Sequence, residues 1–328
     1  MSSKNQFSLP DSYKMRNFPC IAEFSIPGFE ISHPKDQIKC LWTNDVEKDA
    51  CFESFINRIT ESMNTRKHYP VLRISDGELE FLFGRIWFNK REGILNNIIS
   101  FFRYIRDNLL NQGGLNAYSV GIYRSGKYSF KEINELRPVF LKEISNILGT
   151  GSVAFHLNYL SYPFHEQYFP KLDNLLQSLD IDINVKNTIP FYFVYALFAS
   201  GRARAIFSGK HICLVHSASP EVRHIVEKNL LTALNVAKIS WLTISKERSF
   251  YDVLELDNIA DCDALFVGGG IGKANLFCQL SKFPGPIIDV GFYFEVWRDP
   301  DNRFKRVYCA SDDEWASRGV SNVFGAGI

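Results

Sequence analysis

The chain has 328 residues, of which 46% are hydrophobic and 22% are charged, a composition that excludes a disordered or fibrous protein. Its 37 Lys and Arg nearly balance its 36 Asp and Glu, so no global field would attract nucleic acid or anionic lipid. Any phosphate recognition therefore needs a local site.

Residues 1–45 are predicted to form an irregular arm, because they are rich in Pro, Ser and Lys and show little periodicity. Apolar residues recur at helical spacing from about Val46 to Met63, and Pro70–Ile74 has the character of a short strand. Further helices are predicted at about 79–83, 93–110 and 130–148, and strands at 118–123 and 152–158.

The second half alternates more clearly between strands and helices. Strands are predicted at 211–216, 238–244, 263–267 and 286–290, and helices at 220–234, at 249–256 and from the turn after Val267 to about Lys282. This alternation predicts an α/β fold, with a Rossmann-like, mostly parallel sheet and helices on both faces. We expect residues 46–328 to form a single domain with an elaborated middle at about 125–205.

The seven cysteines and the first residues favour a cytoplasmic protein. The cysteines form no CxxC pair and no zinc-type spacing, and an odd, scattered set is typical of reduced thiols. The polar start lacks the apolar core of a signal peptide. The most apolar run, 189–199, is too short to span a bilayer. We expect no nucleic-acid partner and at most peripheral contact with a membrane.

The first candidate site is Asp76-Gly77-Glu78, directly after the strand predicted at 70–74. Open α/β sheets bind ligands at the carboxyl ends of their strands. Two carboxylates there could hold Mg²⁺ or Mn²⁺, and Gly77 would leave room for a bulky ligand. The alternative is that Asp76 caps a helix and Glu78 is a first-turn acid favoured by the helix dipole.

The second candidate is the glycine turn after the strand predicted at 263–267. It has neither the Walker A spacing nor the GxGxxG spacing. Its backbone N–H groups could still bind a phosphate or a nucleotide, although close packing of strand on helix explains the glycines equally well. The candidate contacts are Gly268, Gly269, Gly270, Gly272 and Lys273.

Three further residues follow predicted strands or lie within them. His216 could contact a phosphate or a ribose, or it could be structural. Asp289 lies within an apolar run, where an unpaired carboxylate would be costly, so it needs a partner in a site or in a buried hydrogen bond. Glu295 is a weaker candidate.

Two further groups of residues could bind a substrate, but each could instead have a structural or surface role. The aromatic-dense stretch 154–166 could stack an acceptor sugar or cover the core. Four basic residues could contact a pyrophosphate or could be solvated surface charges: Arg124, Lys127, Arg202 and Arg204.

Two segments resemble a known family. Arg73-Ile-Ser-Asp-Gly-Glu-Leu79 resembles the R-x-G-D-G-E-L signature of the GT-D glycosyltransferases, a family first described as a domain of unknown function. The stretch 264–291 resembles its second hallmark, a strand ending in a glycine turn, a helix and an (A/I)IDIGH strand. Ser75 replaces a glycine of the signature, and Phe292 replaces the final His.

The resemblance covers about residues 68–297 and implies a GT-D type fold. It also implies transfer from a nucleotide sugar, typically a UDP-sugar, to a glycan, glycolipid or glycoprotein acceptor. A divalent cation, Mn²⁺ or Mg²⁺, would be held through Asp76 and Glu78, while Arg73 and Asp289 match two further family positions. If the enzyme inverts, a carboxylate must take the acceptor's proton, and Glu295 and Glu80 are the candidates.

Two other functions remain open. One is a nucleotide-dependent oxidoreductase that uses the glycine turn, although the missing GxGxxG spacing disfavours it. The other is a non-catalytic nucleotide- or carbohydrate-binding module, in which Asp-Gly-Glu is only a helix cap.

Overall fold

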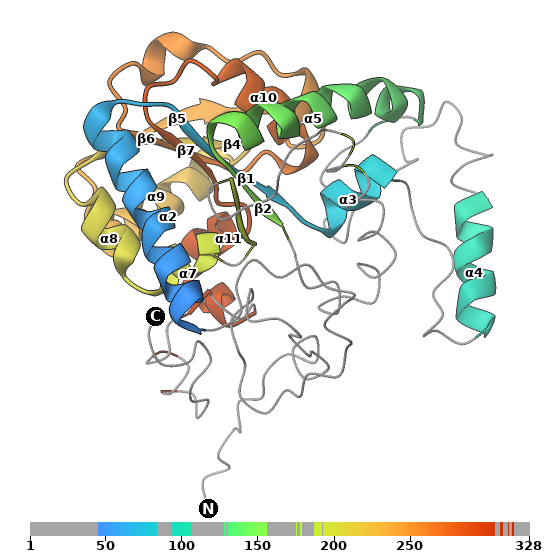
Figure 1. Ribbon diagram of the computed structural model, residues 1–328, viewed down its shortest axis with the longest axis horizontal. Coiled ribbons are helices and arrows are strands. Elements are labelled where there is room, and N and C mark those ends of the chain that lie inside the picture. Colours follow the sequence, from blue (N-terminus) through green and yellow to red (C-terminus); the bar gives the residue numbers. More distant parts are fainter. Residues whose placement is uncertain are drawn as a thin grey trace, which may run out of the picture.

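The computed structural model describes residues 45–83, 94–105, 128, 130–155, 187–191 and 193–305, together with six single residues: 175, 178, 309, 310, 314 and 317. In this part of the chain, seven strands form one sheet in the order β3-β2-β1-β7-β6-β4-β5 (Figure 1). All six strand pairs are parallel, so the predicted α/β fold with a mostly parallel sheet is confirmed. The strands are β1 (Tyr69–Ile74), β2 (Ser152–Phe155), β3 (Thr188–Pro190), β4 (His211–His216), β5 (Lys238–Thr243), β6 (Ala264–Val267) and β7 (Pro286–Asp289).

The central strands are mostly apolar because both of their faces are covered. All residues of β1, β6 and β7 are buried, as is usual for a parallel strand between two helical layers. The edge strand β5 is mostly half-buried or exposed. A polar or charged residue at the end of a central strand therefore needs partners from neighbouring elements.

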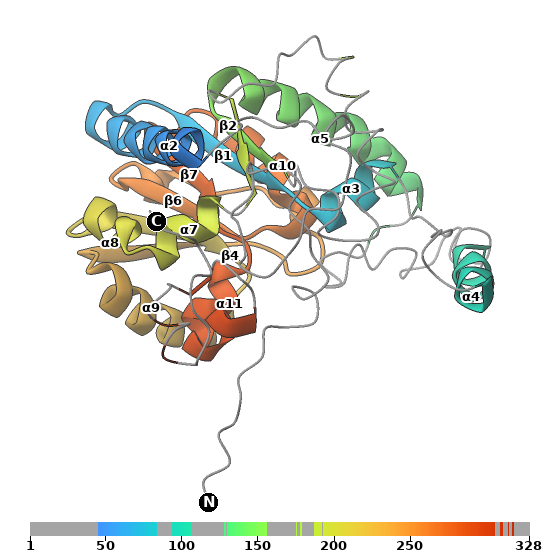
Figure 2. The same ribbon diagram turned by 60° about the horizontal axis from the view of Figure 1, so that its bottom comes forward.

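Helices cover both faces of the sheet. The connections β1-α5-β2 and β4-α9-β5 run toward opposite edges, and right-handed crossovers then place α5 and α9 on opposite faces. α10 packs on α5. Phe52 and Phe55 of α2 contact Phe193 of α7. α2, α7, α8, α9 and α11 form the helical layer on the face opposite α5 (Figure 2). The α-helices are α2 (Asp45–Thr65), α3 (Asp76–Phe83), α4 (Ile94–Ile105), α5 (Phe130–Thr150), α7 (Phe193–Ala199), α8 (Arg202–Phe207), α9 (Pro220–Leu234), α10 (Lys273–Gln279) and α11 (Tyr293–Arg298).

The structure differs from the sequence prediction at several places. The helix predicted at 249–256 is instead two 3-10 turns, η4 (Ser249–Tyr251) and η5 (Leu256–Ile259). The reason is that the Asp252 carboxylate accepts hydrogen bonds from the backbone N–H and the hydroxyl of Ser245, which holds the segment as a loop. β3, α7 and α8 were not predicted, and the strand predicted at 118–123 lies outside the described residues.

Two more 3-10 turns complete the described elements, η6 (Gly270–Gly272) and η7 (Pro300–Lys305). None of the helices in this part of the chain has the length and apolar character needed to span a lipid bilayer.

Candidate functional site

Arg73 and Asp289 lie at the carboxyl ends of the neighbouring strands β1 and β7. The backbone N–H of Arg73 donates to Oδ2 of Asp289 at 3.1 Å, and Nε donates to the Asp289 carbonyl at 2.7 Å. Nη2 of Arg73 forms an ion pair with Oδ1 of Asp289 at 3.3 Å. Both side chains are buried. The prediction that Asp289 has a partner is therefore confirmed.

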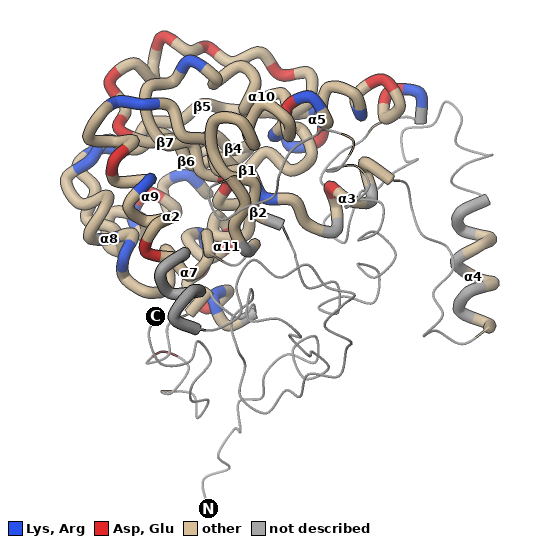
Figure 3. The backbone as a smooth tube through the Cα atoms, in the orientation of Figure 1, with Lys and Arg blue, Asp and Glu red and all other residues tan. Residues whose placement is uncertain are grey.

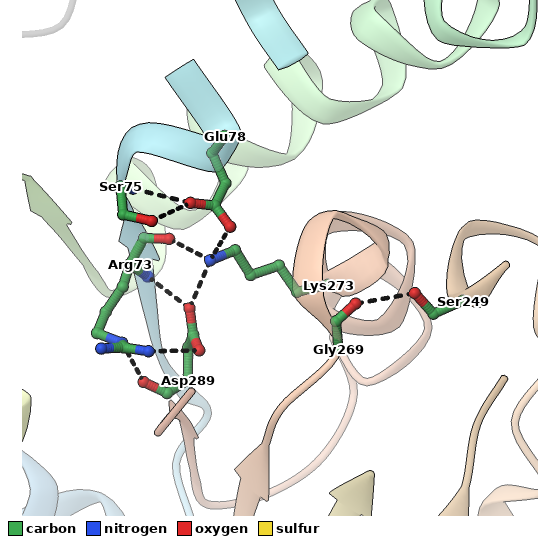
Figure 4. A network of polar contacts seen from close by, with 7 residues as sticks. All are labelled: Arg73, Ser75, Glu78, Ser249, Gly269, Lys273 and Asp289. Carbon is green, nitrogen blue, oxygen red and sulfur yellow. Dashed lines mark hydrogen bonds and ion pairs between the residues drawn. The ribbon is translucent and has the colours of Figure 1, made fainter. Parts of the chain in front are cut away.

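Lys273, the first residue of α10, reaches into the same place (Figure 4). Its Nζ lies 2.5 Å from the Arg73 carbonyl, 2.8 Å from Oδ2 of Asp289 and 2.7 Å from Oε1 of Glu78. An ammonium has three N–H donors, and these three acceptors match them. A direct contact between Lys273 and a nucleotide phosphate, as the sequence suggested, would need one of these bonds to be given up.

Glu78 closes the first turn of α3. Its Oε2 accepts hydrogen bonds from the backbone N–H of Ser75 at 2.8 Å and from the Ser75 hydroxyl at 2.7 Å. This is the glutamate half of a capping box. Ser75 is therefore the residue before the helix, whereas Asp76 and Gly77 are its first two residues. The side chains of Asp76 and Glu80 lie outside the described residues.

The four charges of this network balance, since Arg73 and Lys273 face Asp289 and Glu78. Burial alone would raise the pKa of the Asp289 carboxyl, but Lys273 and Arg73 outweigh it and hold that pKa below its usual value. Burial alone would lower the pKa of the Arg73 guanidinium, but Tyr195 and Asp289 outweigh it and the pKa is raised. Both groups are therefore charged at neutral pH.

Two aromatic rings and a glycine fix the Arg73 guanidinium. Its Cζ lies 4.8 Å from the centre of the Phe191 ring and 4.7 Å from that of Tyr195, both cation–π distances. Gly291 has a φ of 45°, and a Cβ at that position would lie 1.6 Å from Nη2 of Arg73. Among the described residues, Nη1 of Arg73 has no hydrogen-bond partner. Phe191 and Tyr195 were not predicted as site residues, although two aromatic residues four apart in an apolar run are a visible signal.

Protein atoms fill the space beside the glycine turn. A Cβ on Gly268 would lie 2.5 Å from the Phe294 ring, and one on Gly272 would lie 2.1 Å from the Ser249 hydroxyl. Gly269 is crowded in the same way by Leu276, at 2.3 Å. Close packing, the alternative to nucleotide binding, thus accounts for three of the four glycines. Gly270 differs because it has a φ of 55°, which favours glycine.

His216 ends β4 on the other side of Gly268. Its ring stacks on Phe294 with centroids 4.1 Å apart, and its buried Nδ1 has no hydrogen-bond partner in the described part of the chain. Burial, with Arg298 and Arg223 as smaller causes, lowers the pKa of His216 to about 4. The imidazole is therefore neutral at pH 7.

The other predicted residues lie elsewhere. Glu295 forms an ion pair with Arg298 inside α11. Arg202 pairs with Glu53 of α2, and Arg204 donates to the carbonyl of Thr232 at 3.2 Å. Arg124, Lys127 and the aromatic stretch beyond residue 155 lie outside the described residues.

A metal site is not apparent from the described side chains alone. Within them, no group of three or more His, Cys, Asp or Glu residues is arranged to hold an ion. Of the predicted pair, only the Glu78 carboxylate is described, and both of its oxygens already have protein partners.

Comparisons with known proteins return structures only. No family model and no curated protein matches the sequence. One solved structure, of a selenomethionine-substituted domain of unknown function 1792, matches with 14% identity and a TM-score of 0.42, covering 81% of this chain and 87% of that one. Another, in which that domain is described as having a distinct glycosyltransferase fold, matches with 15% identity and a TM-score of 0.39, covering 83% of this chain and 94% of that one.

Proposed function

We propose that the chain is a glycosyltransferase that transfers a sugar from a nucleotide sugar, most simply a UDP-sugar, to a glycan-type acceptor. The observation that carries this proposal is that the two segments that resemble the GT-D family contact each other in the folded chain. Arg73 and Glu78 from the first segment contact Lys273 and Asp289 from the second, at the carboxyl ends of two central strands. That edge is where open α/β sheets bind ligands.

The protein residues have separate roles in this proposal. Asp289 and Lys273 are positioning residues, because they hold the Arg73 carbonyl and guanidinium and the Glu78 carboxylate in place. Nη1 of Arg73, an NH2 group with two N–H donors, has no hydrogen-bond partner among the described residues. We assign that group to an oxygen of the substrate, because a buried donor without a partner is costly.

Asp76 and Glu78 would hold the divalent cation. Their carboxylate oxygens are the ligand type that Mg²⁺ and Mn²⁺ prefer. Oε1 of Glu78 accepts one bond, from Lys273, and a carboxylate oxygen has a second acceptor position. Glu78 can therefore join a cation bound mainly by Asp76. Such a cation, when bound, offsets the negative charge that grows on the departing diphosphate.

A thermal-shift screen of the full chain tests this proposal. We expect UDP with Mn²⁺ to raise the melting temperature more than the sum of the two added alone, because each ligand completes the site of the other. Asp76→Asn should remove this synergy and abolish sugar transfer. Asp257→Asn, an exposed aspartate in η5, is the matched control and should behave like the unchanged chain.

Two results would overturn the proposal, one from an assay of sugar transfer and one from the thermal-shift screen. Transfer that persists in Asp76→Asn with excess chelator would exclude the cation role. Stabilisation by NAD(P) and not by any nucleoside diphosphate would favour the oxidoreductase instead.

A further inference from the structure

Helix α4 carries a large apolar face that is exposed. Ile94, Leu95 and Phe102 are 80%, 70% and 64% exposed, and Ile98 and Ile99 are also exposed. In two views α4 stands apart from the other labelled helices and strands (Figures 1 and 2). Exposed apolar surface on this scale normally marks an interaction site.

The sequence of α4 is amphipathic in the sense of a helix that lies on a surface. At 100° per residue, its apolar positions fall on one broad side. The remaining side holds its polar positions, namely Asn96, Asn97, Ser100 and Arg103. With 12 residues, α4 is about 18 Å long. This pattern is typical of helices that lie in the plane of a membrane interface.

The stretch of sequence around α4 carries a net positive charge, although the whole chain is nearly neutral. Residues 85–107 contain five Lys and Arg and two Asp and Glu. Arg103 is the one charged residue in the sequence of α4, whereas Lys and Arg mix with Asp and Glu over the rest of the described chain (Figure 3). A basic segment around an apolar face is complementary to a bilayer with anionic headgroups.

We infer that α4 docks the protein on an anionic lipid bilayer, with its apolar face at the boundary between headgroups and acyl chains. The excess of Lys and Arg over Asp and Glu in residues 85–107 supplies the electrostatic attraction to the lipid phosphates. This inference is independent of the proposed function, because it uses neither the residues at the carboxyl ends of β1 and β7 nor a nucleotide.

Vesicle flotation of the full chain tests the inference. The protein should float with phosphatidylcholine vesicles that contain phosphatidylglycerol, less with phosphatidylcholine alone, and less at high salt. Leu95→Asp with Phe102→Asp should reduce vesicle binding at least about tenfold, because two apolar side chains no longer enter the bilayer. Val253→Asp is the matched control, since Val253 is 88% exposed outside α4, and it should bind like the unchanged chain.

Four outcomes would overturn the inference. Unchanged binding of the double variant, or an equal loss in Val253→Asp, would show that α4 does not carry the contact. A chain that forms a dimer through α4 and ignores vesicles would assign the face to a second copy. A large fall in melting temperature of the double variant would show that the face packs within the chain.

Discussion

At the scale of single residues, His216 is the titratable group whose environment predicts a pH effect. Its folded-state pKa is lowered to about 4 from 6.5, so the unfolded chain binds this proton at a higher pH than the folded chain does. The corresponding stability is present above about pH 6.5 and is lost as the pH falls toward 4, by at most about 3 kcal/mol. His216→Phe keeps a ring against Phe294 and removes the titration. Urea unfolding should therefore show a shallower loss of stability in this variant between about pH 6.5 and pH 4.5.

A second histidine supplies the control for this prediction. His224 is exposed in α9, and His224→Phe should keep the pH dependence of the unchanged chain. Equal slopes for all three proteins would mean that His216 is solvated and titrates normally.

At the scale of elements, Lys273 joins the start of α10 to the ends of β1 and β7 and to the first turn of α3. Lys273→Met would leave the buried Glu78 and Asp289 carboxylates with one cation fewer. We expect a loss of about 3–5 kcal/mol in the free energy of unfolding, because removing one member of a buried ion pair leaves the other charge buried without compensation. Lys282→Met, an exposed lysine just after α10, should change stability by less than about 0.5 kcal/mol.

A double-mutant cycle makes this prediction specific to the network. Adding Glu78→Gln to Lys273→Met should cost less than the sum of the two single changes, by about 1 kcal/mol or more, since the two side chains are in contact. Additive costs in urea unfolding would argue that the Lys273–Glu78 pair contributes nothing.

The elements also show what could be predicted from the sequence. β1, β4, β6 and β7 were predictable because a buried parallel strand is an apolar run bounded by polar residues or glycine. β3 has three residues, too few for any pattern, and α7 is apolar on all sides because it is almost wholly buried.

The candidate site was predictable in part for a similar reason. Arg73, Glu78 and Asp289 could be assigned to one edge of the sheet, because each follows or ends a strand. The bonds of Lys273 could not, since they depend on the directions of side chains across elements distant in sequence. The cap formed by Ser75 and Glu78 was not predicted, although Ser and Glu three residues apart are the sequence pattern of a capping box.

At the scale of the molecule, one sheet joins the first three strands to the last four through the pair of β1 and β7. β1 pairs with β2 on one side and with β7 on the other, so the two sets of strands share one core. We therefore expect urea unfolding to be a single transition, in which the intrinsic fluorescence of the five tryptophans and the far-UV circular dichroism change together. Val71→Ala, in the buried centre of β1, should shift both probes equally. A shift in circular dichroism alone would indicate two independently folding units.

The place of β7 beside β1 also bears on how the protein is made. β1 leaves the ribosome with one edge unpaired, and its partner on that side follows roughly 200 residues later, which at about 5–20 residues per second is a wait of about 10–40 s. Throughout that interval a strand that is wholly buried in the folded protein has backbone N–H and C=O groups that can pair with any other nascent strand nearby. Successful synthesis should therefore depend on chaperones that shield the growing chain, and a C-terminal truncation before β7 should yield aggregates and not a smaller folded protein.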